Sequence, residues 1–314
     1  MRRSLIILLG LCFALGAQSA NAATFGISDQ QATTFTDPLY KPLKLKAARY
    51  IAPYDVTSDA TQRERFVAWY GAALVAKQRL LVSFEHSRTR GKEQKAPSAR
   101  VYEKATKAFK KSFPKVREIN TWNEINRCQT GSRTEGQPRK LCSVKTGPKL
   151  LQSYYKSNRK VFKGSRYKIV PLNVLDERNP GKAVQYVKAF KRIAKPAPKI
   201  WGIHNYSDTN RFSMSRTKKI IKAIGPKGEV WLLETGGIVR LGSSLPFNEA
   251  RAAKALGCMF TIAKKIRRVK RLYIYQFNGA APGASFDAGL VDNNRKRAGY
   301  NVVKNRKARA CTGK

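Results

Sequence analysis

Short apolar runs alternate with longer amphipathic stretches along most of the chain. The short runs have the length of buried strands, and this alternation is typical of repeated βα units around a parallel sheet. Eight runs are therefore predicted to be strands: residues 24–28, 48–54, 80–86, 116–122, 168–175, 200–204, 230–234 and 272–277.

Between these runs, hydrophobic positions recur with the period of a helix. The clearest apolar stripe consists of Val101, Tyr102, Ala105, Ala108 and Phe109, with lysines on the opposite face. Similar stripes occur within residues 66–74 and 252–262. These segments are predicted to be helices of an outer ring, and their apolar residues are assigned to packing.

Eight strands that alternate with helices fit an α/β fold, the closed (β/α)8 TIM barrel, which typically has about 250 residues. Residues 23–314 would supply one such domain and not two. In this architecture the loops after the strands build the binding cleft. Residues 127–145, which are polar, and residues 278–292, which are rich in Gly and Ala, are predicted to lie there.

Residues 1–22 have the three parts of a secretory signal peptide. A basic start precedes an apolar run from Leu5 to Ala17, and Ala20-Asn21-Ala22 suits cleavage after Ala22. The run is too short to span a bilayer comfortably, and no later stretch is apolar enough to do so. The mature protein is expected to begin at Ala23 and to be a secreted, soluble monomer.

Four cysteines remain after the leader is excluded: Cys128, Cys142, Cys258 and Cys311. An even number in an exported chain favours disulfides, and Cys128 with Cys142 would close a loop rich in Gly, Ser and Arg. Cys258 with Cys311 is the expected second pair, and the connectivity stays open. A metal site is the alternative, but the chain has no CxxC and no histidine near a cysteine. No metal or cofactor is expected.

The charge is extreme: 63 lysines and arginines stand against 19 acidic residues, a formal net charge of +44. Such a field would concentrate polyanions, whether teichoic acids, uronate polymers, anionic lipids or nucleic acid. The basic residues could equally be solvated helix faces with no partner. No nucleic-acid motif is present, and an export signal argues against an intracellular target, so specific nucleic-acid binding is not expected.

Two glutamates each close a predicted strand: Glu124 in Thr121-Trp122-Asn123-Glu124, and Glu234 in Trp231-Leu232-Leu233-Glu234. A carboxylate at the end of a buried strand is costly to desolvate. Because the ends of all barrel strands converge on one mouth, these two side chains are predicted to face one another. Paired carboxylates are the groups that cleave glycosidic bonds. Taken singly, each glutamate could also be a polar turn or loop residue.

These residues resemble landmarks of the clan A glycoside hydrolases, of a family 5 or 39 type, and the likeness covers nearly the whole mature chain. Asn123-Glu124 resembles the fourth-strand Asn-Glu motif, and Glu234 resembles the seventh-strand nucleophile. Arg49 resembles the arginine held near that nucleophile. His86 resembles the third-strand histidine, and His204-Asn205-Tyr206 resembles the sixth-strand His-x-Tyr motif.

The resemblance implies a retaining glycosidase that acts on O-glycosyl bonds of a poly- or oligosaccharide, an acidic one among the candidates. Glu124 would be the acid/base, and the neighbouring Glu234 carboxylate would keep it protonated at rest. Arg49 would hold Glu234 ionised, and Tyr206 would donate a hydrogen bond to it. Asn123 would bind the sugar 2-hydroxyl.

His86 and His204 are the only histidines in the chain, and both stand where a predicted strand meets the cleft. They would line the subsite next to the cleaved bond. Either one alone could be a hydrogen-bonded residue without a catalytic part.

One landmark departs from the family pattern. The eighth strand of such enzymes usually ends with a tryptophan that forms the floor under the sugar, whereas Tyr275-Gln276-Phe277-Asn278 offers Phe277. A phenylalanine can stack on a sugar but gives less area and no indole donor. The sugar, the linkage and endo or exo action therefore stay open. Runs around Trp201 to His204 and Glu234 to Gly237 also resemble exported actinobacterial members.

Some polar and aromatic residues at strand ends have two readings. Asp29, Asp55, Asp176 and Asp208 could contact sugar hydroxyls or cap helices. Trp201 and Trp231 are assigned to the core, and Trp122 is left open between core and ligand platform.

A different function class is a non-catalytic envelope- or glycan-binding protein on a hydrolase scaffold, because fold does not guarantee activity. A pure binder has no need of two carboxylates with their supporting residues. The sequence therefore favours the enzyme.

Overall fold

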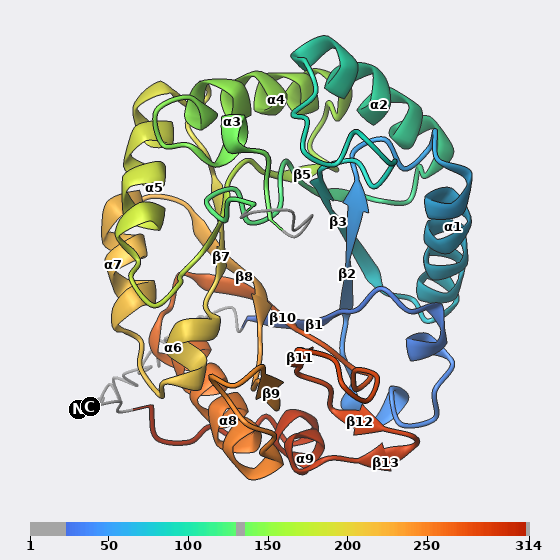
Figure 1. Cartoon of the computed structure of the whole chain (residues 1–314), viewed down its shortest axis with the longest axis vertical. Coiled ribbons are helices and arrows are strands. Elements are labelled where there is room, and N and C mark those ends of the chain that lie inside the picture. Colours follow the sequence, from blue (N-terminus) through green and yellow to red (C-terminus); the bar gives the residue numbers. More distant parts are fainter. Residues whose placement is uncertain (1–22, 130–135, 312–314) are drawn as a thin grey trace, which may run out of the picture.

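The computed structural model describes residues 23–129 and 136–311, and nine parallel strands form its central sheet. The sheet curls around one axis, with helices outside it (Figure 1). Its strands, in chain order, are β1 (Thr24–Ser28), β2 (Ala47–Pro53), β3 (Arg79–Glu85), β4 (Glu118–Asn120), β5 (Lys168–Val170), β6 (Asn173–Leu175), β7 (Ile200–His204), β8 (Glu229–Thr235) and β10 (Val269–Ile274).

The predicted barrel is confirmed, with one difference at its fifth strand. The sheet runs β5-β4-β3-β2-β1-β10-β8-β7-β6, so its two ends are β5 and β6. These ends are joined by Pro171 and Leu172. Because proline has no N–H to give to the ladder, it interrupts the run predicted as one strand over residues 168–175. Eight predicted strands thus become nine, and the barrel is closed except at this break.

Helices follow the strands and cover the outer face of the barrel (Figure 1). They are α1 (Ala60–Val75), α2 (Ala99–Ser112), α3 (Arg139–Cys142), α4 (Gly147–Val161), α5 (Gly181–Ile193), α6 (Tyr206–Asn210), α7 (Ser215–Ile224), α8 (Glu249–Lys265) and α9 (Ala298–Lys304). Side chains cap the starts of three predicted helices: Asp59 accepts from the Gln62 N–H, Ser98 from Val101 and Asn248 from Arg251.

Alternation along the strands divides the core into two layers. One small cluster fills the barrel interior: Ala47, Leu81, Val170, Ile200, Trp231, Leu233 and Tyr273. A larger cluster packs strands against helices, and it includes Trp69, Trp122 and Trp201. The core assignment of Trp201 and Trp231 is confirmed, and Trp122 is fully buried as well.

Two pairs of short strands lie in the segments that follow β8 and β10. β9 (Arg240–Leu241) pairs antiparallel with β11 (Phe286–Asp287), and β12 (Val291–Asp292) pairs with β13 (Arg295–Lys296). β11 and β12 lie within residues 278–292, one of the two loops that the sequence places at the cleft.

Both expected cysteine pairs are bonded, Cys128 to Cys142 and Cys258 to Cys311. Such bridges are typical of oxidising compartments. Among residues 23–129 and 136–311, no helix has the length and apolar character needed to cross a bilayer. The predicted leader, residues 1–22, lies outside the described residues.

Candidate active site

The two glutamates come from opposite sides of the barrel mouth, after β4 and within β8. On β8, Trp231 and Leu233 point into the barrel, so strict alternation would turn Glu234 outward. A register shift lies between the β7–β8 pairs Ile203↔Leu232 and His204↔Glu234. Bulges of this kind re-aim side chains, and here the bulge directs Glu234 into the mouth.

Glu124 has an unusual backbone. Its φ is 38°, in the left-handed region that residues with a Cβ seldom adopt. The neighbouring backbone holds it there: the Asn123 N–H bonds to the Phe84 carbonyl at 2.7 Å, and the Ile125 N–H bonds to the Asn173 carbonyl at 3.0 Å. Strained residues held by their surroundings cluster at functional sites.

His204 lies between the two carboxylates and joins them. Its Nδ1 is 2.9 Å from Glu124 Oε1 and 3.0 Å from Glu234 Oε2. One oxygen of each glutamate and this nitrogen all lie within 4.8 Å of one another. His204 is fully buried, and the glutamates keep exposed fractions of only 8% and 5%. The predicted facing pair is therefore present, with a histidine wedged into it.

The surroundings of His204 determine where its proton sits. Its Nε2 is 2.9 Å from the Asn173 amide nitrogen and 3.5 Å from Arg49 Nη2. Nδ1, which faces the two carboxylates, carries a hydrogen that both can accept. That single N–H points at both carboxylates.

Arg49 is the buried cation of the site, with no exposed surface. Its Nη1 lies 3.5 Å from Glu234 Oε2, which confirms the predicted pairing with that carboxylate. Its other hydrogens are fixed by Ser83 and Ser28 at 2.9 Å each and by Asn123 Oδ1 at 2.6 Å. A guanidinium so held cannot leave Glu234 without leaving several buried polar groups unpaired.

The surroundings of Glu124 favour its ionised form, whereas the sequence led us to expect a protonated one. Burial raises the pKa of Glu124, but the hydrogen bond from His204 and the charges of His204 and Arg127 outweigh it and lower the pKa to about 2. Arg127 Nη1 lies 3.3 Å from Glu124 Oε2. Donors and positive charge thus favour the ionised carboxylate, against the repulsion from Glu234 that the sequence argument relied on.

The expected hydrogen bond from Tyr206 to Glu234 is absent. Tyr206 Oη is buried and has no hydrogen-bond partner among the described residues. Glu234 Oε2 is instead shared by His204 and Arg49. The hydroxyl lies within the field of the site, because burial and then the Glu234 charge raise the pKa of Tyr206.

Phe277 cannot be the predicted sugar platform. It is fully buried in the core between barrel and helices, and its ring packs edge-on against Tyr40 at 5.7 Å. Tyr275, two residues earlier, is half-buried at the mouth. Burial and then the Glu234 charge raise the pKa of Tyr275, so its phenol lies in the field of that carboxylate. Of the two aromatic residues, Tyr275 is therefore the one that lies near the carboxylates.

The remaining predicted residues divide between the site and its margin. Asn123 is bound to Arg49 and is 5% exposed. His86 directly follows β3 and is 8% exposed, and its Nδ1 has no partner within the described part of the chain. Among the described residues, no hydrogen bond or ion pair joins His86 to either carboxylate, so its place in a sugar subsite stays a prediction.

Sequence reasoning missed the groups that hold the site together. Asn173, at the start of β6, places its amide nitrogen near Asn120, Asn123 and His204. Its inward direction follows from alternation once the break at Pro171 is known, and the predicted run over 168–175 hid that break. Ser28 and Ser83 carry no sequence signal beyond their places on β1 and β3.

The strand-end aspartates serve the backbone. Asp29 accepts from the N–H groups of Gln31 and Phe277. Asp176 accepts from two N–H groups at the start of α6, and Asp208 accepts from the Thr217 N–H in the first turn of α7. The capping alternative fits Asp176 and Asp208, whereas Asp29 joins two loops and Asp55 accepts from the Ser87 hydroxyl.

Glu124, His204 and Glu234 also have the spacing of a metal-ligand set. The donor chemistry does not fit an ion, however. The Nδ1 that would face it carries the hydrogen that both carboxylates accept, and the Arg49 guanidinium already lies beside Glu234.

No protein-family model matches the sequence, and a comparison with curated proteins gives no match. Solved structures do match. GH5_18 from Streptomyces cattleya in complex with GlcNAc aligns over 91% of this chain and 80% of that chain, with a TM-score of 0.66 and 12% identity. A psychrophilic glycoside hydrolase family 10 endo-beta-1,4-xylanase aligns over 90% and 96%, with a TM-score of 0.68 and 13% identity.

A β-glucuronidase from Ruminococcus gnavus in complex with uronic deoxynojirimycin aligns over 91% of this chain and 49% of that chain, with a TM-score of 0.57 and 13% identity. At these identities the likeness is one of fold. The chain therefore has the barrel fold of clan A glycoside hydrolases, as the sequence resemblance implied. The likeness to actinobacterial members stays a prediction.

Proposed function

We propose that this protein is a secreted retaining glycoside hydrolase, with Glu234 as nucleophile and Glu124 as acid/base. The observation that carries the proposal is the approach of the two glutamates across the barrel mouth. One carboxylate oxygen of Glu124 lies within 4.8 Å of one carboxylate oxygen of Glu234. Retaining glycosidases hold their carboxyl groups about 5–5.5 Å apart, whereas inverting enzymes need about 6.5–9.5 Å to admit a water. The short separation supports retention.

In the first step, Glu234 attacks the anomeric carbon while Glu124 protonates the leaving oxygen, and a covalent glycosyl-enzyme forms. In the second step, Glu124 takes a proton from water, which attacks the same carbon and releases Glu234. Arg49 keeps the nucleophile ionised. Asn123, whose amide oxygen is engaged by Arg49, would bind the sugar 2-hydroxyl through its amide nitrogen.

Glu124 must gain a proton before the first step. Arg127, whose side chain is 44% exposed, can be displaced from Glu124 Oε2 by an arriving sugar. Loss of that charge and exclusion of water both raise a carboxyl pKa. The His204 N–H would then serve Glu234 alone, so substrate binding itself would prepare the acid.

The test uses the purified mature protein and its Glu234→Gln and Glu124→Ala variants on a panel of bacterial and plant glycans. Glu234→Gln should reduce turnover by several orders of magnitude while the fold and glycan binding persist. Glu124→Ala should retain the first step on substrates with good leaving groups. Product stereochemistry, followed by proton NMR, should show retention. Full activity of Glu234→Gln, or an inverted product, would contradict the assignment.

Secretion after cleavage at Ala22 and a monomeric state belong to the same proposal. The two disulfides support an oxidising destination. Mass spectrometry of the exported protein should find Ala23 at its N-terminus.

A further inference from the structure

A cavity of about 600 Å³ lies where the loops after β1, β8 and β10 meet. Gln31 and Asp37 contribute from the first loop, Arg240 and Phe247 from the second, and Asn278 and Asp292 from the third. None of these was a predicted site residue.

The cavity is connected to the carboxylate site through the β9–β11 strand pair. Arg240 follows Glu234 by six residues and lies on β9, which pairs with β11. Phe286 of β11 contacts Tyr206 and Tyr275, with ring centres 6.0 and 5.8 Å apart. Both tyrosines lie in the field of Glu234. A glycan chain that leaves the catalytic pair on this side would therefore meet the cavity.

Arg240 presents donors without acceptors. Its Nε is buried and has no hydrogen-bond partner among the described residues. Asp287 lies opposite Arg240 in the β9–β11 pair, but its carboxylate is held at 2.8 Å by Arg297 and accepts from the Gly289 N–H. Asp292 lies 3.3 Å from Arg297 and 3.6 Å from Arg295. Two of the three carboxylates that line the cavity are thus committed to other cations, and the third, Asp37, accepts from the Leu39 N–H at 2.7 Å.

An aromatic ring borders the same cavity. Phe247 is 52% exposed, although rings of this size are normally buried. The Arg297 guanidinium lies 5.7 Å from its centroid. A half-exposed ring offers a flat apolar surface on which a sugar can stack. Asp37, Gln31 and Asn278 bring acceptors and amides for sugar hydroxyls.

We propose that this cavity is a subsite for an acidic sugar unit of the substrate, with the sugar carboxylate on Arg240 and the sugar ring against Phe247. A carboxylate can accept from two N–H groups of a guanidinium at once, whereas a hydroxyl satisfies only one. The inference rests on the proposed function, because it makes the substrate a glycan that carries hexuronate units. The high positive charge of the chain favours the same class of ligand.

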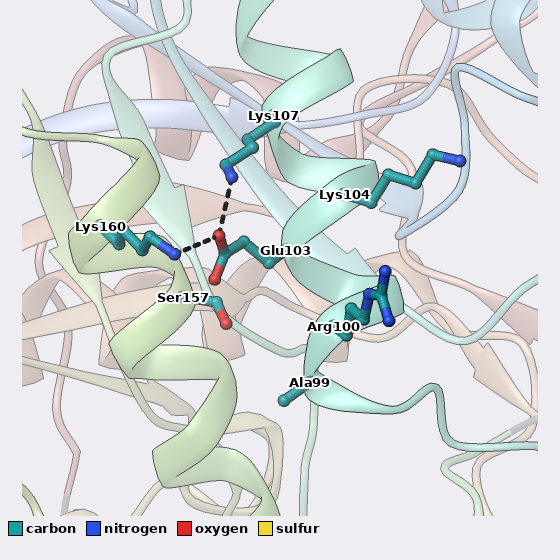
Figure 2. A pocket seen from close by; sticks show the side chains of 7 residues that line it. All are labelled: Ala99, Arg100, Glu103, Lys104, Lys107, Ser157 and Lys160. Atoms are coloured by element: carbon teal, nitrogen blue, oxygen red, sulfur yellow. Dashed lines mark ion pairs between the residues drawn. The ribbon is translucent and has the colours of Figure 1, made fainter.

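Positive charge is not unique to this cavity, because a groove between α2 and α4 is also basic. Arg100, Lys104, Lys107 and Lys160 line it. Figure 2 shows Lys107 and Lys160 directed at Glu103, which each approaches to 2.8 Å. Two of its four cations are thus already paired, and the groove contains no aromatic ring. It provides a matched control for diffuse attraction.

The experiment measures binding by calorimetry in 0.15 M NaCl, which limits diffuse attraction. All measurements use the Glu234→Gln variant, so that the probes are not hydrolysed. The probes are β-1,4-linked oligoglucuronate, β-1,4-linked oligomannuronate and α-1,4-linked oligogalacturonate, each beside its carboxyl-reduced counterpart. We expect at least one acidic probe to bind about tenfold more tightly than its neutral counterpart. Adding Arg240→Gln should abolish that preference, Phe247→Ala should weaken both members of the pair, and Lys104→Gln should change neither.

The inference is overturned if no acidic probe is preferred, or if Arg240→Gln and Lys104→Gln reduce binding equally. The two proposals fail separately. A preference that depends on Arg240 in a protein that hydrolyses no glycan would leave the subsite standing without the enzyme. Hydrolysis that Glu234→Gln removes, without a preference for acidic probes, would leave the enzyme standing without the subsite.

Discussion

At the centre of the site, one N–H group serves two carboxylates. His204 donates from Nδ1 toward both glutamates, while Asn173 and Arg49 block the opposite nitrogen with donors. Two anionic side chains then face the buried Arg49 and the partly exposed Arg127. In the proposed mechanism, substrate binding must remove the charge on Glu124 by favouring its protonated form.

Arg127→Gln tests this balance. Burial raises the pKa of Glu124, and His204 with Arg127 lowers it, so removing the Arg127 charge should raise that pKa above its value of about 2. The alkaline limb of kcat/KM, which reports the free acid, should move to higher pH. Lys140→Gln, an exposed change in the same loop, should leave the limb in place.

The same variant has a readout in stability. The pKa of Glu124 is lower in the folded protein than in the unfolded chain. Its charged form therefore stabilises the fold at pH values above the unfolded pKa, and this stabilisation is lost as the pH falls through the folded pKa of about 2. Arg127→Gln should therefore show a smaller decrease in the free energy of unfolding on acidification than the wild-type protein. An alkaline limb that stays fixed or moves to lower pH would contradict this account.

Tyr275 and Phe277 should separate binding from folding. Phe277→Ala removes a fully buried ring and should lower the free energy of unfolding by about 3–5 kcal/mol. Tyr275→Ala opens only a half-buried position at the mouth and should raise KM with a smaller loss of stability. Urea titrations and kinetics on an active substrate measure both effects. Equal losses of stability in the two variants, with KM unchanged in Tyr275→Ala, would mean that neither residue forms the sugar platform.

At the scale of elements, strand ends decide the site, and sequence alone placed most of them. Apolar runs located every barrel strand, and β1 and β7 have the predicted bounds. The run over 168–175 hid Pro171, and with it the inward direction of Asn173. The bulge before Glu234 leaves no local signal, because it depends on how β8 pairs with β7. Packing also determines that Phe277 is buried in the core, which its place after the last strand did not reveal.

The two disulfides should contribute differently. Cys258–Cys311 closes a span of 53 residues and fastens α8 to the C-terminal segment, whereas Cys128–Cys142 spans 14 residues near Glu124. Loop-closure entropy predicts about 4 kcal/mol for the longer loop and about 3 kcal/mol for the shorter one. Paired Cys→Ala variants, compared by urea titration, should follow that order. Loss of Cys128–Cys142 should also reduce kcat/KM, because Arg127 directly precedes Cys128.

At the scale of the whole molecule, a single excess of charge acts on both folding and binding. With 63 basic against 19 acidic residues, most cations have no acidic partner to offset them. Their mutual repulsion destabilises the compact state at low ionic strength. A fold that tolerates this repulsion gains a strong attraction for polyanions, which is the property that an acidic glycan substrate would exploit.

Screening should therefore stabilise this protein. Raising NaCl from about 10 mM to about 300 mM shortens the Debye length from about 30 Å to about 6 Å, so long-range repulsion weakens more than contacts between close, buried pairs such as Arg271 and Glu118 at 2.8 Å. The urea midpoint should rise over this range, and binding of an acidic glycan should weaken over the same range. Sucrose at equal osmolality controls for effects unrelated to charge. A midpoint that falls with salt would mean that attractive ion pairs outweigh the repulsion.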